Sequence, residues 1–428
     1  MANEGRGKHV LLTGANGFVS THILSMLLER SYIVTATVRS EKRASEIIKA
    51  HPDWEGKIEF AIVEDFTTAA PFDIIFEKAK DLFTYIIHTA SPLRFSVNDI
   101  QKEMIEPAEK GTHEILKSAH KHSKSLERVV IIASAVAVLS SFEDITKEGK
   151  PYTEKDWNPV TAEQAIEKND PVLGYNVSKK RAELAAWKFM EEQKPAFDLT
   201  IISPDIITGP MIHYIDGKKS INETNHFAIA SFIDGTHKDI EGVTFPFYHF
   251  VDVRDVAQAH VDSLTNKAAS NQRILLIAGL ISPQLVVNII RENFPQLRDR
   301  VPAGNPSQVL PKNVHPTGWD MKTSLQILAQ GTKEKKWEYR SLEKSVVDAV
   351  NIHKRIIELK RSKDEFKQRY QVREIKEIKM PSLLLILTSQ AVIPATRKPT
   401  GWYLVPLPIP ALPSPLYLPP QLTPHSFK

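Results

Sequence analysis

The stretch VLLTGANGFVS, residues 10–20, decides the fold because three local patterns meet in it. The apolar run Val10–Thr13 predicts a short strand, Gly14 and Gly17 predict a tight turn, and a helical apolar pattern follows directly. Gly17 would let a ligand approach the backbone closely, and Ser20 is small enough for close packing of the helix on the strand. Such a turn directs backbone N–H groups towards an anion. We therefore expect a pyrophosphate-binding turn; the alternative is an ordinary strand-to-helix turn with glycine caps.

Strand-like and helix-like segments alternate from this turn to about residue 203. Consecutive apolar strands joined by helices indicate a parallel sheet that is covered on both faces. We therefore predict an α/β fold with a Rossmann-type doubly wound parallel sheet. The strand-like segments are Val10–Thr13, Ile33–Val38, Ile58–Val63, Tyr85–Thr89, Arg128–Ala133 and Leu199–Ser203. The helix-like segments are His22–Leu28, Lys42–Lys49, Phe72–Lys80, Ile105–His120 and Gly174–Glu192.

The alternation weakens after Pro204, which predicts a smaller, interleaved C-terminal lobe that binds the substrate. Short strands are expected in it near Tyr248–Val251 and Arg273–Ile277, and Ser341–Ile357 has the pattern of a closing helix. We therefore predict a dinucleotide-binding domain at residues 1–203, with a later contribution from about 248–270, and a substrate lobe at 204–359.

Residues 360–428 form a basic and then proline-rich tail, which we expect to be disordered. Met380–Lys428 holds 11 of the 28 prolines of the chain, a density that removes backbone donors and blocks helices and inner strands. From Lys354 onward the chain has 13 of its 55 basic and 5 of its 51 acidic residues, so the body before it carries a net charge of −4. An acidic body gives no electrostatic case for nucleic acid.

Composition excludes several further classes of protein. The chain has no cysteine, which excludes a disulfide framework, thiolate metal sites and a cysteine nucleophile. The longest apolar stretch, Leu383–Ile393, has 11 residues, whereas a membrane-spanning helix needs about 20. The polar start of the chain does not resemble a secretion signal. We expect a cytoplasmic protein without a membrane partner or a metal, either a monomer or a homodimer.

The end of the second predicted strand discriminates between cofactors. An acid there would bind the ribose 2′-hydroxyl of NAD, but this chain has Arg39, followed by Lys42 and Arg43. An arginine can bind a 2′-phosphate through charge-assisted hydrogen bonds, which favours NADP(H). Asp65, after the third strand, can accept a hydrogen bond from the adenine amino group; the alternative role is a turn or helix cap.

Tyr175 and Lys179 are four residues apart in a predicted helix, so they share one helix face. A lysine next to a tyrosine should lower the phenol pKa, which would let Tyr175 act as an acid or base near neutral pH. Ser134 lies at the end of the apolar strand Arg128–Ala133, where strand ends of a doubly wound sheet border the ligand crevice. Its hydroxyl could bind the carbonyl oxygen that the tyrosine protonates.

Five motifs in this order resemble the extended short-chain dehydrogenase/reductases. They are Gly14-x-x-Gly17, His88-Thr89-Ala90-Ser91-Pro92, Ser134, the Tyr175/Lys179 pair and Val251-Asp252-Val253-Arg254-Asp255-Val256-Ala257. The similarity covers roughly residues 8–353. It is greatest to fungal NADPH-dependent aldehyde and ketone reductases of the yeast methylglyoxal reductase type, which are related to plant dihydroflavonol 4-reductases.

The resemblance implies a role for each matching residue. Ser134, Tyr175 and Lys179 would be catalytic: Tyr175 protonates the substrate oxygen, Lys179 binds the nicotinamide ribose and tunes Tyr175, and Ser134 orients the carbonyl. The implied NADP(H)-binding residues are Gly14, Ala15, Asn16, Gly17, Phe18 and Val19 for the pyrophosphate, Arg39 and Arg43 for the 2′-phosphate, Asp65 for the adenine, Thr89, Ala90 and Ser91 for the ribose–nicotinamide path, and Pro204 and Ile207 beside the nicotinamide.

The chain also departs from the family pattern. Ala135, Ile206 and Leu93 stand where aromatic residues are frequent, and Ser203 replaces a common asparagine. Three smaller side chains predict a wider pocket, which favours a bulkier ketone or aldehyde over a small dicarbonyl such as methylglyoxal.

The expected activity is NADPH-dependent reduction of a small-molecule carbonyl substrate. The alternatives are an NAD-dependent nucleotide-sugar epimerase or dehydratase, against which Arg39 argues, and a non-catalytic NADP-binding regulator, against which the retained Ser134, Tyr175 and Lys179 argue.

Overall fold

The computed structural model describes residues 4–91, 96–139, 141, 144–147, 149–217, 220–243, 245 and 247–369, and the side chains of the last helix up to Arg355. The strands are β1 (His9–Thr13), β2 (Ile33–Val38), β3 (Ile58–Ile62), β4 (Tyr85–His88), β5 (Arg128–Ile132), β6 (Asp198–Pro204), β7 (Ile206–Thr208), β8 (His249–Asp252), β9 (Gln272–Leu276) and β10 (Gly279–Leu280). The helices are α1 (Phe18–Glu29), α2 (Glu41–Ala50), α3 (Asp73–Ala79), α4 (Glu106–His122), α5 (Ala162–Glu167), α6 (Pro171–Gln193), α7 (Glu223–Asn225), α8 (Ser231–Ile233), α9 (Val253–Ser263), α10 (Pro283–Asn293), α11 (Lys322–Gly331) and α12 (Leu342–Arg369).

Seven parallel strands form the large sheet, in the order β3-β2-β1-β4-β5-β6-β9. The chain winds outward from β1 to β3, returns to β4 on the other side of β1, and then winds outward in the opposite direction. This reversal is the doubly wound Rossmann-type topology, so the predicted fold class is confirmed. The register pairs Thr13 of β1 with His88 of β4, which places the two strand ends side by side at the reversal.

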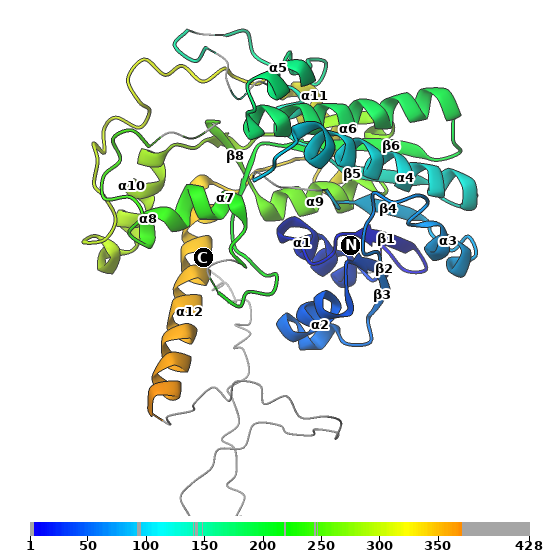
Figure 1. Ribbon diagram of the computed structural model, residues 1–428, viewed down its shortest axis with the longest axis horizontal. Coiled ribbons are helices and arrows are strands. Elements are labelled where there is room, and N and C mark those ends of the chain that lie inside the picture. Colours follow the sequence, from blue (N-terminus) through cyan, green and yellow to red (C-terminus); the bar gives the residue numbers. More distant parts are fainter. Residues whose placement is uncertain are drawn as a thin grey trace, which may run out of the picture. The chain divides into compact units, whose positions relative to one another are not determined.

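The two faces of the sheet are covered by different helices because successive side chains of a strand point to opposite faces. Val10 and Leu12 belong to a core under α1, α2, α9 and α11, whereas Leu11 belongs to a core under α3, α4 and α6. Figure 1 shows α4 and α6 side by side over the sheet, and α10 near the start of α12 at the other end. Both faces of each central strand are therefore buried, which explains the uninterrupted apolar runs in the sequence.

A second sheet, in the order β10-β8-β7, forms the core of the smaller lobe together with α10 and the first half of α12. The predicted strand near 248–251 is β8 of this sheet. The assignment of the strand near 273–277 to the same lobe was wrong, because β9 pairs with β6 in the large sheet. The later contribution to the large sheet therefore includes α9 and β9 and extends beyond the expected limit near residue 270. Residues 1–370 form one compact unit that contains both sheets.

The tail prediction needs one correction at its start. Residues 360–369 continue α12 without a break, so helix replaces the disorder expected there. The helical pattern of Ser341–Ile357 runs on because the next residues are charged helix formers without a proline or glycine. The proline-rich segment from Met380 onward lies outside the described residues, as do Pro92 and Leu93.

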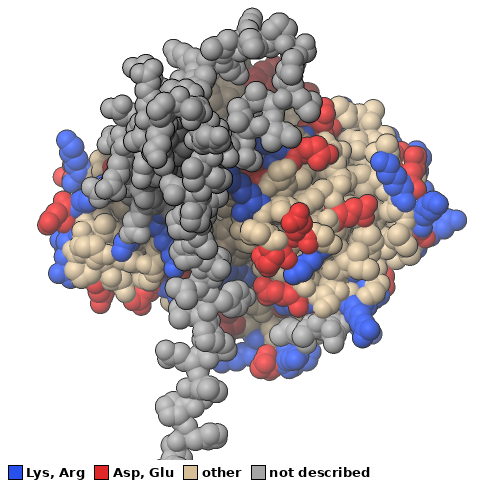
Figure 2. Space-filling model, turned by 90° about the horizontal axis from the view of Figure 1, so that it is seen from below, with Lys and Arg blue, Asp and Glu red and all other residues tan. Residues whose placement is uncertain are grey.

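Acidic and basic side chains lie interspersed on the face shown in Figure 2, over the part that is not grey. In the described part of the chain, no helix has both the length and the apolar character that a bilayer crossing requires.

Truncation after Leu359 should leave the fold intact, because the buried side chains Val346, Ala349 and Val350 all precede that point. We expect a melting temperature within about 5 °C of the full-length protein, since a larger shift would represent roughly 1 kcal/mol or more. A matched truncation after Ser341 removes all of α12, exposes the core of the smaller lobe and should lower the melting temperature far more. A large loss in the Leu359 truncation would show that the tail packs on the body.

Candidate active site

The carboxyl ends of β1 and β4 are tied together by the hydroxyl of Thr13, which is fully buried. Thr13 Oγ1 accepts hydrogen bonds from the N–H groups of Thr89 and Ala90, both at 3.1 Å, and lies 2.9 Å from His88 Nδ1. Because two donors already occupy this oxygen, its own proton goes to His88 Nδ1, so the imidazole proton is on Nε2. Burial lowers the His88 pKa to about 3, which keeps the ring neutral.

The glycine turn lies at the mouth of a cleft beside these strand ends. Gly14 has φ +69°, and a Cβ there would lie 3.1 Å from the Cα of Ala90, so only glycine fits without strain. The predicted cofactor residues that line the cleft are Gly14, Asn16, Gly17, Arg39, Arg43, Thr89, Ala90 and Ser91. The cleft is also lined by residues that the sequence analysis did not assign to it: Ser20, Thr37, Val38, Val63, Phe66 and Phe72.

Two of the residues at the turn have local structural roles. The N–H of Ala15 donates to the carbonyl of Thr37 at 3.0 Å, and its methyl group lies in the core, so Ala15 shapes the turn. Ser20 Oγ donates to the carbonyl of Gly14 at 2.7 Å and holds the helix against the turn. Phe18 and Val19 begin α1, and the first N–H groups of a helix have no partner within it.

Arg39 and Arg43 both reach the cleft, as the sequence predicted for a phosphate. The guanidinium of Arg39 lies 5.9 Å from the ring centre of Phe66, and Arg43 pairs with Glu46 at 2.8 Å. Asp65 Oδ1 accepts the N–H of Thr67 at 2.8 Å and its hydroxyl at 2.7 Å. Asp65 therefore caps a turn, the alternative role that its sequence position allowed, and its contact with an adenine stays a prediction.

Helix α6 places Tyr175 and Lys179 next to Ser134, which follows β5. Asp170 caps this helix by accepting the N–H groups of Val172 and Leu173, and Pro171 occupies its first turn. The hydroxyls of Ser134 and Tyr175 are hydrogen-bonded to each other. Three residues that were predicted to act together are thus brought together across 45 residues of sequence.

Lys179 extends from this group to the cleft. Its Nζ donates to Ser91 Oγ at 2.9 Å and lies 5.7 Å from the centre of the Tyr175 ring. The group of Ser134, Tyr175 and Lys179 is therefore linked through Ser91 to the cleft under the glycine turn.

The expected lowering of the Tyr175 pKa by Lys179 was wrong for this structure. Burial raises the Tyr175 pKa, the charge of Asp205 raises it further, and only the hydrogen bond from Ser134 lowers it. Burial also lowers the pKa of Lys179 itself, to about 8. The desolvation of both groups outweighs the attraction expected from their spacing alone.

Two asparagines that the sequence analysis did not identify as structural fix the loop after Ser134 against α6. Asn176, fully buried beside Tyr175, accepts hydrogen bonds from Ser141 and from Asn158 Nδ2, the latter at 2.9 Å. Asn158 Nδ2 also donates to the carbonyls of Val136 and Leu139, both at 2.7 Å. These bonds set the distance between the loop that carries Ser134 and the helix that carries Tyr175.

Helix α6 is held from a second direction by a buried ion pair. Glu183 lies one turn after Lys179, and Arg273 of β9 pairs with it at 2.7 Å. Nη1 of Arg273 also donates to the carbonyl of Asp156 at 2.6 Å. Removing one partner of such a pair leaves an uncompensated buried charge, which typically costs about 3–5 kcal/mol.

Pro204 and Ile207 lie on either side of the break between β6 and β7, at the carboxyl end of β6. Ile206 and Ala135, which were expected to widen the pocket, are both buried in apolar cores, so the pocket width stays a prediction.

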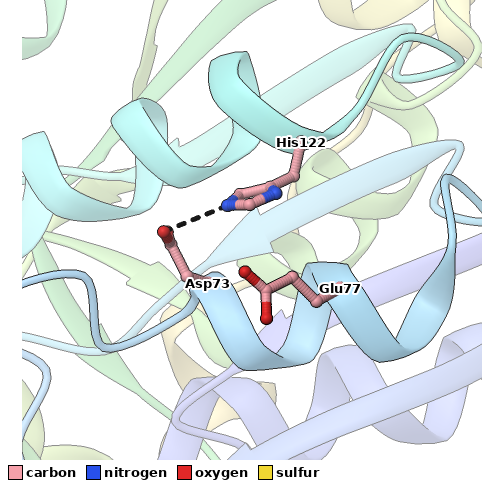
Figure 3. A group of neighbouring side chains, drawn as sticks. All are labelled: Asp73, Glu77 and His122. Atoms are coloured by element: carbon pink, nitrogen blue, oxygen red, sulfur yellow. Dashed lines mark ion pairs between the residues drawn. The ribbon is translucent and has the colours of Figure 1, made fainter.

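One group of ligand-type side chains lies elsewhere, on α3 and α4. Atoms of Asp73, Glu77 and His122 lie within 4.8 Å of one another, and Asp73 is 3.0 Å from His122 Nε2 (Figure 3). Lys121 Nζ already contacts the Asp73 carboxylate at 2.7 Å, and Ser118 donates to its other oxygen at 2.6 Å. Burial would raise the Asp73 pKa, but these hydrogen bonds keep it well below its usual range. The Lys121 ammonium already neutralises the Asp73 carboxylate, so we interpret this cluster as an ion-paired contact between α3 and α4.

The reversed parallel sheet, the glycine turn and the cleft at the strand ends define a Rossmann-type nucleotide-binding protein. A family model described as the NAD dependent epimerase/dehydratase family matches residues 10–278. The chain belongs to this family, the extended short-chain dehydrogenase/reductases, which confirms the resemblance drawn from its motifs.

Similar proteins include the NADPH-dependent methylglyoxal reductase GRE2 of Saccharomyces cerevisiae, which is 32% identical over 348 residues, or 80% of this chain and 97% of the relative. The ketoreductase azaE of Aspergillus niger is 33% identical over 347 residues, covering 80% of this chain and 96% of the relative. The crystal structure of yeast methylglyoxal/isovaleraldehyde reductase Gre2 complexed with NADPH superposes with a TM-score of 0.74 at 31% identity, over 81% of this chain and 98% of that chain.

The lowered pKa of Lys179 gives a pH-dependent effect on stability. Between about pH 8 and the ordinary lysine value of 10.5, the unfolded chain keeps a proton that the folded protein has lost, so this group's contribution to the free energy of unfolding rises with pH. Lys179→Met removes that contribution, so its stability relative to wild type should be more favourable at pH 7 than at pH 10. Urea unfolding at both pH values measures the difference.

Lys188→Met, on the exposed side of the same helix, is the matched control for the loss of a lysine side chain. Equal stability differences for Lys179→Met at pH 7 and pH 10 would contradict the lowered pKa.

Proposed function

We propose that this protein is an NADPH-dependent reductase that converts an aldehyde or ketone to an alcohol. One observation carries the proposal. Ser134, Tyr175 and Lys179 lie together at the carboxyl edge of the sheet, directly beside the cleft under the glycine turn. The activities named for the relatives, methylglyoxal reductase, isovaleraldehyde reductase and ketoreductase, support an aldehyde or ketone as the substrate class.

The cleft fits an NADP(H) molecule in its chemistry. Gly14 leaves room where a side chain would collide with Ala90, and the N–H groups at the start of α1 suit a pyrophosphate. Arg39 and Arg43 would bind the 2′-phosphate. Asp65 would bind the adenine, Thr89 to Ser91 the ribose–nicotinamide path, and Pro204 and Ile207 would flank the nicotinamide. When bound, NADPH supplies a hydride for the carbonyl carbon.

The side chains of the site would complete the reaction at the carbonyl oxygen. Ser134 donates a hydrogen bond to this oxygen and orients it, and Tyr175 transfers its phenolic proton to it as the carbon accepts the hydride. Lys179, held by Ser91, would bind the nicotinamide ribose. Burial disfavours a phenolate before reaction, so Tyr175 holds its proton until the carbonyl oxygen accepts it.

An NAD-dependent epimerase or dehydratase, which the family name allows, fits this cleft less well. Arg39 stands where an acid would bind the 2′-hydroxyl of NAD. The retained Ser134, Tyr175 and Lys179 likewise favour an enzyme over a non-catalytic regulator.

Tyr175→Phe should abolish reduction and leave NADPH binding nearly intact, because only the proton donor is lost. We expect kcat to fall by the roughly 10²–10⁴-fold that is typical of a general acid, measured as NADPH oxidation with a panel of aldehydes and ketones. The matched control is Tyr85→Phe, since Tyr85 lies at the opposite end of its strand and donates to Glu127 at 2.9 Å. A Tyr175→Phe variant that keeps more than about a hundredth of wild-type turnover would refute the acid role.

Arg39→Asp should reverse the cofactor preference, because it removes a phosphate contact and adds a repulsive charge. The expected loss in NADPH affinity is about 2–4 kcal/mol, with little change for NADH, measured by fluorescence titration of both nucleotides. Arg300→Asp makes the same charge change at an exposed position in the smaller lobe and should not alter the preference. Equal affinity of the wild type for NADH and NADPH would overturn the cofactor assignment.

A further inference from the structure

Asp205 stands out among the acidic residues because one of its oxygens is buried without a partner. The residue follows β6 and is only 7% exposed. Its Oδ1 accepts the N–H of Ile206 at 2.9 Å, but its Oδ2 has no hydrogen-bond partner. Among the described residues, it is the only buried carboxylate oxygen without a hydrogen-bond partner.

Other buried acids near the two sheets pair with arginines, apart from Glu114, which accepts the N–H of Ala70 at 3.0 Å. Asp252 binds Arg254 at 2.8 Å, and Asp262 binds Arg30 at 2.6 Å. An unpartnered buried carboxyl oxygen costs free energy, so a group that hydrogen-bonds to it would be stabilising. The missing partner of Asp205 is therefore to be sought in a ligand.

Asp205 lies at the edge of the sheet that also carries Ser134. It lies between Pro204 and Ile206, at the carboxyl edge of the sheet, where ligands of doubly wound folds bind. Asp205 is near enough to Tyr175 for its ionised form to raise the Tyr175 pKa. Burial raises the Asp205 pKa to about 8, so at neutral pH the carboxyl is mostly protonated and can both donate and accept a hydrogen bond.

We propose that Asp205 is a specificity-determining residue that hydrogen-bonds a hydroxyl group of the substrate on a carbon α or β to the carbonyl. The inference rests on the proposed function, because Ser134 and Tyr175 must hold the carbonyl oxygen for the substrate hydroxyl to lie within reach of Asp205. The substrate class is then hydroxyaldehydes and hydroxyketones. An apolar analogue would leave the Asp205 oxygen unpaired in the enzyme–substrate complex. A site built for a hydroxyl rejects such analogues strongly.

The experiment compares isovaleraldehyde with 3-hydroxybutanal, which has a hydroxyl where isovaleraldehyde has a methyl group. The measured quantity is the ratio of kcat/KM for 3-hydroxybutanal to that for isovaleraldehyde, in wild type, Asp205→Leu and Asp205→Asn. We expect the ratio to fall about tenfold or more in Asp205→Leu, which has a similar shape without polar atoms, and to be largely rescued in Asp205→Asn. Using the change in this ratio cancels the different intrinsic reactivities of the two aldehydes.

Melting temperatures of the variants separate a loss of selectivity from a loss of stability. Asp205→Leu also removes the acceptor of the Ile206 N–H, whereas Asp205→Asn keeps an oxygen for it, so a ratio that follows the polar side chain and not the melting temperature supports the inference. Ser203→Ala is the matched control, because Ser203 Oγ on the same strand is also buried without a partner, and the ratio should not change.

Two outcomes separate the inference from the proposed function. Suppose that the wild type reduces isovaleraldehyde but that the kcat/KM ratio of Asp205→Leu is within about twofold of the wild-type ratio. Asp205 then does not bind the substrate hydroxyl, and the inference is wrong. If the wild type binds NADPH but reduces neither aldehyde, nor any carbonyl compound of the panel, the proposed function itself fails. Should Asp205→Leu not fold, the ratio in Asp205→Ala decides in the same way.

Discussion

One hydroxyl group, Thr13 Oγ1, lies where the winding of the sheet reverses, and the ligand crevice depends on it. It joins the ends of β1 and β4 through the N–H groups of Thr89 and Ala90 and through His88. In a doubly wound sheet the crossovers leave in opposite directions at this point, so the two strand ends separate into a crevice. Thr13 fixes how far they separate, and Gly14 beside it keeps the floor of the crevice free of side chains.

Helix α6, which carries Tyr175 and Lys179, is the second fixed part of the candidate site. Asn176 attaches it to the loop that carries Ser134, and Glu183 attaches it to β9 through Arg273. These partners lie far from each other in sequence and bind α6 from different sides. The helix therefore cannot shift or rotate without leaving buried polar groups unpaired, and this restraint holds Tyr175 and Lys179 near Ser134 and Ser91.

Three of the buried polar atoms without a hydrogen-bond partner lie at the same edge of the sheet. His88 Nε2, Ser203 Oγ and Asp205 Oδ2 are buried there, at or directly after the ends of β4 and β6. Away from this edge, buried acids such as Asp252 and Asp262 are neutralised by arginines.

The sequence by itself determined the features that depend on near neighbours: the glycine turn, the alternation of strands and helices, and the Tyr175/Lys179 spacing. Each rests on backbone geometry over a few residues, so a linear pattern suffices. Tertiary structure alone decided that β9 joins the large sheet, because the sequence of an apolar strand does not specify which strand it pairs with. It alone placed Asp205 near Tyr175 and paired Asn158 with Asn176, since these contacts depend on how distant segments pack. The same packing desolvates Tyr175 and Lys179, which reversed the pKa shift that their spacing predicted for Tyr175.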